Sequence, residues 1–367
     1  MTNRPTPRET SRFTARRRSL LGAAGAAVLG ALGTTAVARP ADAHPVSRKR
    51  RKKMKFSVVA TGLQFPEGPV ALPNGDVLVV EVIAGNLTRI SPDGTKTVVA
   101  EVGGGPNGAA IGPDGRVYIA NNGGLNAFPV GGYVFAGGIP ADYTGGSIQA
   151  VDLETGAVET IYTECDGQQL RGPNDLVFDE HGGLYFTDYG KSDGVTADRG
   201  RLYYALPDGS AITQIAGGME GPNGIGLSPD GSRLYVSETY TARVWWWGVT
   251  GPGQIKGGQS LGGSGNGNFL YTASDYTNFD SLGIDAAGNV CVASLLTHGI
   301  SVVSPEGDLV EFLDIDTDGD PGITNICWGG PGQRTAYVTA SSTGKLLKLD
   351  WPRRGLRLPF ADRVSGR

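Results

Sequence analysis

Three stretches of this chain repeat one phrase with small changes. Residues 105–122 read GPNGAAIGPDGRVYIANN, residues 172–190 read GPNDLVFDEHGGLYFTDYG, and residues 221–239 read GPNGIGLSPDGSRLYVSET. In each copy a short apolar run, a turn and a second apolar run follow the Asn, which is typical of two antiparallel strands. This self-similarity constrains the fold strongly, because repeated units of this size bury their faces only against neighbouring copies.

The repeat extends over most of the chain. Looser copies begin at Phe65, Phe279 and Gly322, and the six anchor residues are spaced 40 to 67 residues apart: Glu67, Asn107, Asn174, Asn223, Asp280 and Asn325. Further apolar runs complete each copy as a four-stranded unit. We therefore predict an all-β fold, a six-bladed β-propeller. The last copy is one strand short, so we expect an N-terminal strand at 56–60 to join the last blade and close the ring.

The first 43 residues differ from the repeats. Arg16, Arg17 and Arg18 precede a stretch rich in Ala, Gly and Leu that ends in the small-residue cleavage pattern Ala41-Asp42-Ala43. We interpret residues 1–43 as an export signal peptide of the twin-arginine type, with a single membrane anchor as the weaker alternative. The expected location is secreted or extracytoplasmic.

The rest of the chain divides into three parts. The basic run at 48–53 lies in a segment, 44–54, that we interpret as a solvated linker. Residues 55–352 are predicted to form the propeller and residues 353–367 a C-terminal tail.

The charge balance limits the partners of this protein. Without residues 1–43 the chain has 25 basic and 34 acidic side chains, and this acidic body argues against a nucleic-acid partner. We expect a monomer that acts on a small molecule and has no membrane contact after signal cleavage. The three Cys residues do not form a disulfide framework, although a pair between Cys291 and Cys327 is left open.

The anchor residues indicate a metal site. The first strand of each propeller blade lines the central channel, so the six anchors are expected to ring one of its openings. Turn formation alone would explain Asn and Asp at these places, but not Glu67. Carboxylate and amide oxygens that converge without His or Cys are typical ligands of a hard cation. The residues therefore favour Ca²⁺, with other divalent cations as alternatives.

Four separately spaced phrases also carry a family resemblance. PEGP at 66–69, GPND at 172–175, PNGIGLSPDG at 222–231 and FDSLGIDAAGNVCVA at 279–293 resemble those of the senescence marker protein/gluconolactonase family. This family includes regucalcin and lactonases and is related to diisopropyl fluorophosphatase.

The resemblance implies both a metal site and an activity. It places Glu67, Asn174, Asn223 and Asp280 around one divalent cation and implies a calcium-dependent hydrolase of lactones. Asp280 is then the preferred general base and Glu67 the alternative. The chain departs from the family at Ser281, where relatives commonly have Gly.

Further residues are candidates for substrate contacts. The resemblance implies such a contact for Arg171, which stands three residues before Asn174 rather than two. Asn107 and Asn174 are also candidates, and His298 is either an accessory contact or an exposed loop residue. The Gly-rich insertion at 121–147 is expected to overhang the channel mouth as a lid.

Some alternatives stay open on the sequence alone. The run DIDTDGD at 314–320 matches the first half of an EF-hand loop, but Asn325 stands in place of its bidentate Glu. An acidic turn is therefore favoured over a second calcium site. The rival functions are a non-catalytic propeller that binds a ligand or protein with a structural calcium, and a phosphotriesterase or cyclase using the same site.

Overall fold

The computed structural model describes residues 51–258, 265–315, 317 and 319–364. The predicted export signal and residues 44–50 of the predicted linker lie outside these ranges. Apart from the short 3-10 turns η2 (Pro331–Gln333) and η3 (Ser341–Thr343), the regular structure in these ranges consists of β-strands. None of the helices described there is long and apolar enough to cross a membrane.

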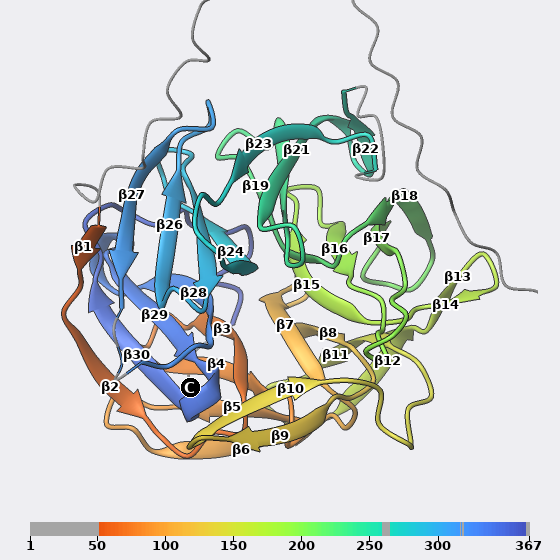
Figure 1. The fold of residues 1–367 in the computed structure, drawn as a ribbon. Coiled ribbons are helices and arrows are strands. Elements are labelled where there is room, and N and C mark those ends of the chain that lie inside the picture. The colour runs from red at the N-terminus through yellow and green to blue at the C-terminus, as the bar shows by residue number, and fades with distance from the viewer. Residues whose placement is uncertain (1–50, 259–264, 316, 318, 365–367) are drawn as a thin grey trace, which may run out of the picture. The chain divides into compact units, whose positions relative to one another are not determined.

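Six sheets are arranged around a common centre as the blades of a propeller (Figure 1), which confirms the predicted fold class. Blade 1 contains β3 (Pro66–Ala71), β4 (Val77–Glu81), β5 (Asn86–Ile90) and β6 (Lys96–Glu101). Blade 2 contains β7 (Pro106–Ile111), β8 (Val117–Asn121), β11 (Ser147–Val151) and β12 (Val158–Tyr162). Blade 3 contains β15 (Pro173–Phe178), β16 (Leu184–Asp188), β17 (Gly200–Ala205) and β18 (Ile212–Met219). Blade 4 contains β19 (Pro222–Leu227), β20 (Arg233–Glu238), β21 (Arg243–Gly251), β22 (Gln254–Lys256) and β23 (Asn268–Thr272). Blade 5 contains β24 (Asn278–Ile284), β25 (Val290–Leu295), β26 (Gly299–Val303) and β27 (Leu309–Asp314). Blade 6 contains β28 (Ile323–Gly329), β29 (Thr335–Ala340), β30 (Lys345–Asp350) and β2 (Phe56–Ala60). Two hairpins stand apart from the blades, β9 (Asn126–Val130) with β10 (Tyr133–Gly137), and β13 (Glu164–Cys165) with β14 (Gln168–Gln169).

The first strand of each blade is the innermost one. Each of these six strands packs against the next, and β28 of the last blade packs against β3 of the first. The N-terminal strand β2 pairs antiparallel with β30, with Phe56 opposite Leu349 and Val58 opposite Leu347. The N-terminal strand therefore completes the last blade, as predicted, and the ring is closed.

Part of the expected linker is a strand. Arg51–Lys53 form β1, which runs parallel to β27 at the outer edge of blade 5. Arg51 Nε lies 2.8 Å from Asp314 Oδ2, and its guanidinium lies over the ring of Phe312. These three residues are therefore part of a sheet rather than a linker, although their side chains are exposed as expected. An edge strand tolerates exposed basic side chains.

The segment after residue 352 belongs to the same folded unit as the propeller. Arg353 Nε lies 3.0 Å from the buried Asp285 Oδ2, and Leu356 N donates to the carbonyl of Ile284. Val364 is buried in the cluster between blades 1 and 2. These contacts show that residues 353–364 are a packed part of the domain rather than an appended tail.

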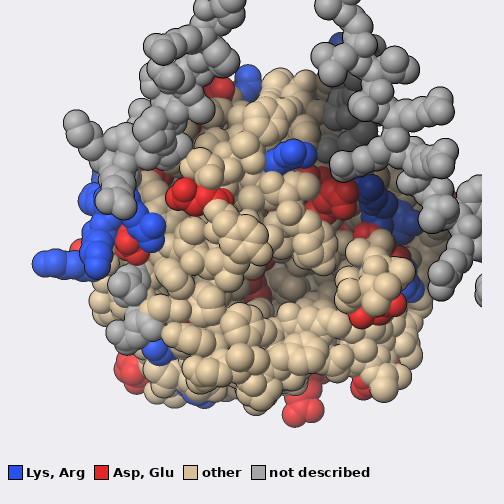
Figure 2. All heavy atoms as spheres, viewed as in Figure 1, with Lys and Arg blue, Asp and Glu red and all other residues tan. Residues whose placement is uncertain are grey.

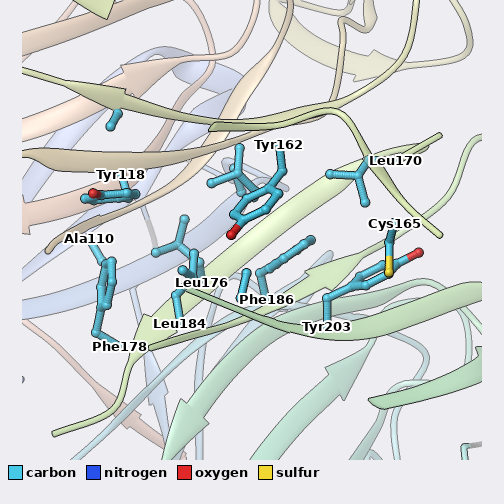
Figure 3. Close-up of a cluster of buried hydrophobic side chains, with 14 residues drawn as sticks. Ala110, Tyr118, Tyr162, Cys165, Leu170, Leu176, Phe178, Leu184, Phe186 and Tyr203 are labelled. Atoms are coloured by element: carbon cyan, nitrogen blue, oxygen red, sulfur yellow. The ribbon is translucent and has the colours of Figure 1, made fainter. Parts of the chain in front are cut away.

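The hydrophobic core is divided among the interfaces between neighbouring blades. Figure 3 shows the cluster between blades 2 and 3, in which Tyr118 meets Phe178 edge to face with ring centroids 5.1 Å apart. In the next interface Trp245 and Trp247 are buried. All three cysteines are free thiols, so Cys291 and Cys327 form no disulfide.

Candidate active site

A cavity of about 380 Å³ lies at the end of the channel where the inner strands begin. Figure 2 shows a hollow near the centre of the ring, with acidic atoms at its base. Five of the six expected anchors line this cavity: Glu67, Asn107, Asn174, Asn223 and Asp280. The structure therefore brings together the four residues for which the resemblance implied a shared cation.

The sixth expected anchor, Asn325, does not line this cavity. In blade 3, Pro173 stands directly before the anchor and pairs with the last residue of β16. In blade 6, the residue that pairs with the last residue of the second strand, β29, is Ile323. Ile323 is therefore the counterpart of Pro173. The residue equivalent to the other anchors is therefore Thr324, which does line the cavity. The expectation for Asn325 was one residue out of register, and a one-residue shift along a strand moves a side chain to the other face.

Close packing of the inner strands explains why Gly follows the anchor in several blades. A Cβ atom at Gly224 would lie 2.3 Å from Leu282 N, and one at Gly108 would lie 2.6 Å from Asp175 Cα. The phrase Asn-Gly therefore reflects a strand-to-strand approach at the channel. In blade 5 the same place is occupied by Ser281, whose Oγ lies 3.3 Å from Asn223 Oδ1.

Glu67 is held in a fixed position on the cavity wall. Its side chain is only 2% exposed, and Oε2 accepts hydrogen bonds from Gly68 N and Asn325 Nδ2, each at 2.9 Å. Burial raises the pKa of Glu67, and hydrogen bonds from Thr324 and Asn325 partly oppose this. Asn325 thus orients the carboxylate of Glu67 from outside the cavity.

Two further carboxyl groups share the electrostatic environment of Glu67. Burial and then the negative charge of Glu67 raise the pKa of Asp280 well above its usual range, and Asp175 adds to the effect. Burial raises the pKa of Asp175 to about 7, with a further contribution from Glu67. The three acids therefore disfavour each other's ionised form in a desolvated place.

These carboxyl groups lack a basic partner within the described part of the chain. No Lys, Arg or His there lies within ion-pair distance of Glu67, Asp175 or Asp280. The buried Oδ1 of Asn174 also has no hydrogen-bond partner among those residues. Unpaired buried oxygens of this kind are costly without a counter-charge.

The donor atoms fit a hard divalent cation. Asn223 Nδ2 donates to Thr239 Oγ1 at 3.1 Å and its Oδ1 accepts one hydrogen bond, from Ser281 Oγ at 3.3 Å, so a second lone pair of that oxygen is left for a cation. The described residues contain no trio of His, Cys, Asp or Glu placed to share a metal. A cation here would therefore depend on two carboxylates together with the amide oxygens of Asn174 and Asn223, a set of ligands that suits Ca²⁺.

Arg171 and His298, both expected to contact substrate, do not line the cavity. Arg171 Nε lies 2.9 Å from Asp198 Oδ2, and its guanidinium lies over the ring of Tyr143. His298 Nδ1 lies 2.6 Å from the carbonyl oxygen of Asp320. Both side chains are therefore engaged by other groups of the protein, and neither lies at the cavity formed by the anchor residues.

The acidic run at 314–320 is only partly described. Asp316 and Asp318 lie outside the described residues. Asp314 pairs with Arg51, and Asp320 accepts hydrogen bonds from Gly322 N at 2.7 Å and Thr343 N at 3.0 Å. These two carboxylates are thus engaged by protein donors.

The 121–147 insertion forms one wall of the cavity. Its hairpin β9–β10 extends from blade 2 across the face of the ring (Figure 1), and β10 packs against η3 of blade 6. Phe135, Ala136, Gly137 and Gly138 from this hairpin line the cavity. The insertion therefore overhangs the mouth, as expected for a lid.

Comparison with known families agrees with this arrangement. A family model described as SMP-30/gluconolactonase/LRE-like region matches residues 65–342, the greater part of the chain. The chain belongs to the SMP-30/gluconolactonase/LRE-like family. All four positions in the expected cation ring lie within the matched range.

Individual relatives of this family member are moderately similar in sequence. A gluconolactonase from Zymomonas mobilis is 27% identical over 311 residues, which cover 78% of this chain and 79% of that protein. The lactonase drp35 from Staphylococcus aureus is 34% identical over 187 residues, half of each chain.

Solved structures of the family share the fold at lower identity. A calcium-binding protein from Agrobacterium tumefaciens, regucalcin, superposes with a TM-score of 0.66 at 17% identity, covering 84% of this chain and 98% of its own. A gluconolactonase from Xanthomonas campestris has a TM-score of 0.62 at 20% identity, covering 82% and 90%.

Sequence reasoning missed several residues of the cavity. Lys191, Asn122, Tyr189 and Tyr240 lie in loops that follow the second strands of blades 2, 3 and 4, and all of them line the cavity. The alternation of apolar and polar residues ends before these loops, so no periodic signal marks them. Their position one to three residues past a strand end was the clue available in the sequence.

Proposed function

We propose that this family member is a calcium-dependent hydrolase of lactones. The observation that carries the proposal is the convergence on one small cavity of the carboxyl groups of Glu67 and Asp280, neither with a basic partner among the described residues, and of the unpartnered Oδ1 of Asn174. Membership of a gluconolactonase-like family supports the reaction class. The cavity volume of about 380 Å³ suits a small molecule.

The residues of the chain supply the ligands and the proton transfer. Glu67, Asn174, Asn223 and Asp280 would hold the cation, which when bound supplies polarisation of the lactone carbonyl. Asp280 accepts the proton of the attacking water as the new C–O bond forms and the ring C–O bond breaks, and the proton ends on the leaving alkoxide oxygen. Glu67 is the alternative base.

Substrate positioning is assigned to the remaining polar anchor. The side-chain amide of Asn107 faces the cavity without a hydrogen-bond partner among the described residues. It is therefore available to a ring or carbonyl oxygen of the substrate. The β9–β10 hairpin shields this place from bulk water, which strengthens charge interactions within it.

The test is a turnover assay on the full chain with a panel of five- and six-membered lactones, with calcium and with a chelator. We expect hydrolysis that is lost with the chelator and restored by calcium. Glu67→Gln should abolish it, whereas the control Glu180→Gln, whose side chain is 83% exposed, should not. Calcium binding without turnover of any lactone would instead favour the rival function, a non-catalytic binding propeller.

We further propose that the protein is exported. The support is the order of Arg16, Arg17 and Arg18 before an apolar stretch and a small-residue pattern at 41–43. Cell fractionation of the chain and of a variant with Arg16→Lys and Arg17→Lys tests this. Cytoplasmic recovery of the unaltered chain would contradict it.

A further inference from the structure

Lys191 is a buried cation inside the cavity. It lies in the loop after β16, is 6% exposed and lines the same cavity as the anchor ring. Its Nζ donates to the carbonyl of Gly124 at 2.6 Å and to Asn122 Oδ1 at 3.4 Å, and it lies over the ring of Tyr143. An ammonium group has three donors, and only two have partners among the described residues.

No carboxylate in the described part of the chain forms an ion pair with Lys191. The acids near Lys191 along the chain are already engaged. Asp188 accepts hydrogen bonds from Arg171 N and Gly172 N, each at 2.7 Å, Asp193 accepts from Val195 N at 2.8 Å and Thr196 N at 2.7 Å, and Asp198 pairs with Arg171. Burial lowers the pKa of Lys191 to about 8, with the charge of Arg171 adding to the effect and that of Asp188 opposing it. The ammonium is thus desolvated without a protein counter-ion.

A purely structural function does not account for this charge. Lys191 does tie the loop of blade 3 to that of blade 2 through Gly124 and Asn122. A neutral amide donor could make the same contacts to oxygen without placing a charge in a desolvated site. Perturbed, buried charges that face a cavity are found preferentially at functional sites.

The charge balance of the cavity indicates what would meet Lys191. Its charged lining residues are Glu67, Asp280 and Lys191. Two carboxylates balance one divalent cation, which leaves the single positive charge of Lys191 uncompensated. The cavity as a whole therefore complements a substrate with one negative charge, which Lys191 could hold through a charge-assisted hydrogen bond.

We propose that Lys191 is a specificity-determining residue that binds an anionic substituent, such as a carboxylate, on the lactone substrate. This inference rests on the proposed function and narrows its substrate class to acidic lactones rather than neutral ones. Lys191 acts on binding and takes no part in the proton transfers at the ester.

The experiment uses two matched substrates, γ-butyrolactone bearing a carboxylate on the ring carbon next to oxygen and the same lactone bearing a carboxamide there. With the full chain and calcium, we expect a higher kcat/KM for the carboxylate. Lys191→Met should lower kcat/KM for the carboxylate about 10- to 100-fold, mainly through KM, with a much smaller loss for the carboxamide. Lys191→Arg should recover part of the preference.

The controls separate this inference from structural damage and from the proposed function. Lys96→Met is the matched variant, because Lys96 Nζ donates to the carbonyl of Thr61 at 2.7 Å on the exposed surface, and it should keep the substrate preference. Equal losses on both lactones in Lys191→Met, or a wild-type preference for the carboxamide, would overturn the inference. If the wild type hydrolyses neither lactone, the proposed function fails for these two compounds. Calorimetric binding of the same compounds then still tests the inference about Lys191. Weaker binding of the carboxylate by Lys191→Met than by the wild type supports the inference, and equal binding refutes it.

Discussion

The two ends of the propeller channel are built from the same six inner strands and differ in almost every chemical respect. The mouth holds the anchor ring in a cavity of about 380 Å³, whereas the opposite end holds a larger cavity of about 470 Å³. The opposite cavity is lined by apolar side chains such as Ile111, Phe178 and Trp328 and by the C-terminal segment 356–362. Asp175 and Asn325 also line this larger cavity, so its wall is not purely apolar.

The difference shows that the convergence of carboxylate and amide oxygens, rather than cavity volume, distinguishes the mouth. At the opposite end Arg357 and Asp362 pair with each other, and Asp175, which also lines that cavity, has no basic partner in the described part of the chain. At the mouth Glu67 and Asp280 have no basic partner in the described part of the chain. The C-terminal segment lines the opposite end of the channel, whereas the mouth brings together two carboxylates and the unpartnered amide oxygen of Asn174.

The largest contrast is expected from removing one acid at each end. Asp280→Asn should lower kcat/KM for lactone hydrolysis by at least about 1,000-fold, because a ligand of the cation and the proposed base are lost together. Asp362→Asn, at the opposite end, should leave it within about 2-fold, since exposed pairs contribute little. Steady-state kinetics with calcium in excess measures both. Equal effects of the two variants would break the distinction between the ends.

The opposite side of the channel should instead respond through stability. Arg353 pairs with Asp285, which is fully buried, so Arg353→Met leaves that carboxylate without its counter-charge. We expect a loss of about 3 kcal/mol in the free energy of unfolding in urea, with unchanged calcium affinity. Arg334→Met is the matched control, because Arg334 makes only an exposed hydrogen bond to the carbonyl of Pro352. Normal stability together with weakened calcium binding in Arg353→Met would contradict the assignment of stability to one end of the channel and cation binding to the other.

Calcium and pH should act together on thermal stability. Burial raises the pKa of Glu67 and Asp280 and that of Asp175 to about 7, so the folded state retains protons that the unfolded chain has already lost. Without calcium, this contribution to stability is therefore lost as pH rises from about 4 to about 7. Calcium replaces the protons, so the rise in Tm that it causes should be larger at about pH 8 than at about pH 5. Differential scanning fluorimetry measures this, and the opposite trend would contradict the account.

Removing the charge of Glu67 tests whether repulsion among the carboxylates at the mouth lowers the stability of the calcium-free protein. Glu67→Gln should raise the Tm of the calcium-free protein at about pH 8 by about 2 °C or more, because it removes a like charge near Asp280, and it should abolish the calcium-dependent rise. Glu180→Gln should change neither value. A lower Tm without calcium would mean that repulsion among the acids is not what the cation relieves.

The smallest effect is expected at the hairpin wall. Phe135→Ala enlarges the cavity from the β9–β10 side without touching the anchor ring. We expect a rise in KM of about 3- to 10-fold with little change in kcat, because the side chain contacts substrate equally in ground and transition states. Phe128 lies opposite Phe135 on the same hairpin but does not line the cavity, so Phe128→Ala is the control.

The sequence predicted the parts of the molecule that are periodic. The repeat predicted six blades, the closing strand at 56–60 and the convergence of Glu67, Asn107, Asn174, Asn223 and Asp280. These five residues converge because each occupies the same position in its blade, and equivalent positions of all blades form a ring around the channel. It failed at Asn325, where Thr324 carries no mark of an anchor. Arg171 was placed by resemblance, but Asp198, far along the chain, holds it away from the cavity.

Non-periodic segments could not be placed from the sequence. Lys191 and Tyr240 lie in loops whose direction is set by contacts with neighbouring blades, and these contacts have no local signature. The strand β1 and the packed segment 353–364 were missed for the same reason. Both are held by partners from blade 5 that lie far away in the sequence, such as Asp314 and Asp285.

The most direct test of the cation site at the mouth is a calorimetric calcium titration of the full chain at about pH 8. We expect binding by the wild type, a loss of affinity of at least about 100-fold in Asp280→Asn, and wild-type affinity in Asp362→Asn. Absence of binding by the wild type, or unchanged affinity in Asp280→Asn, would contradict the assignment of the ring as the metal site.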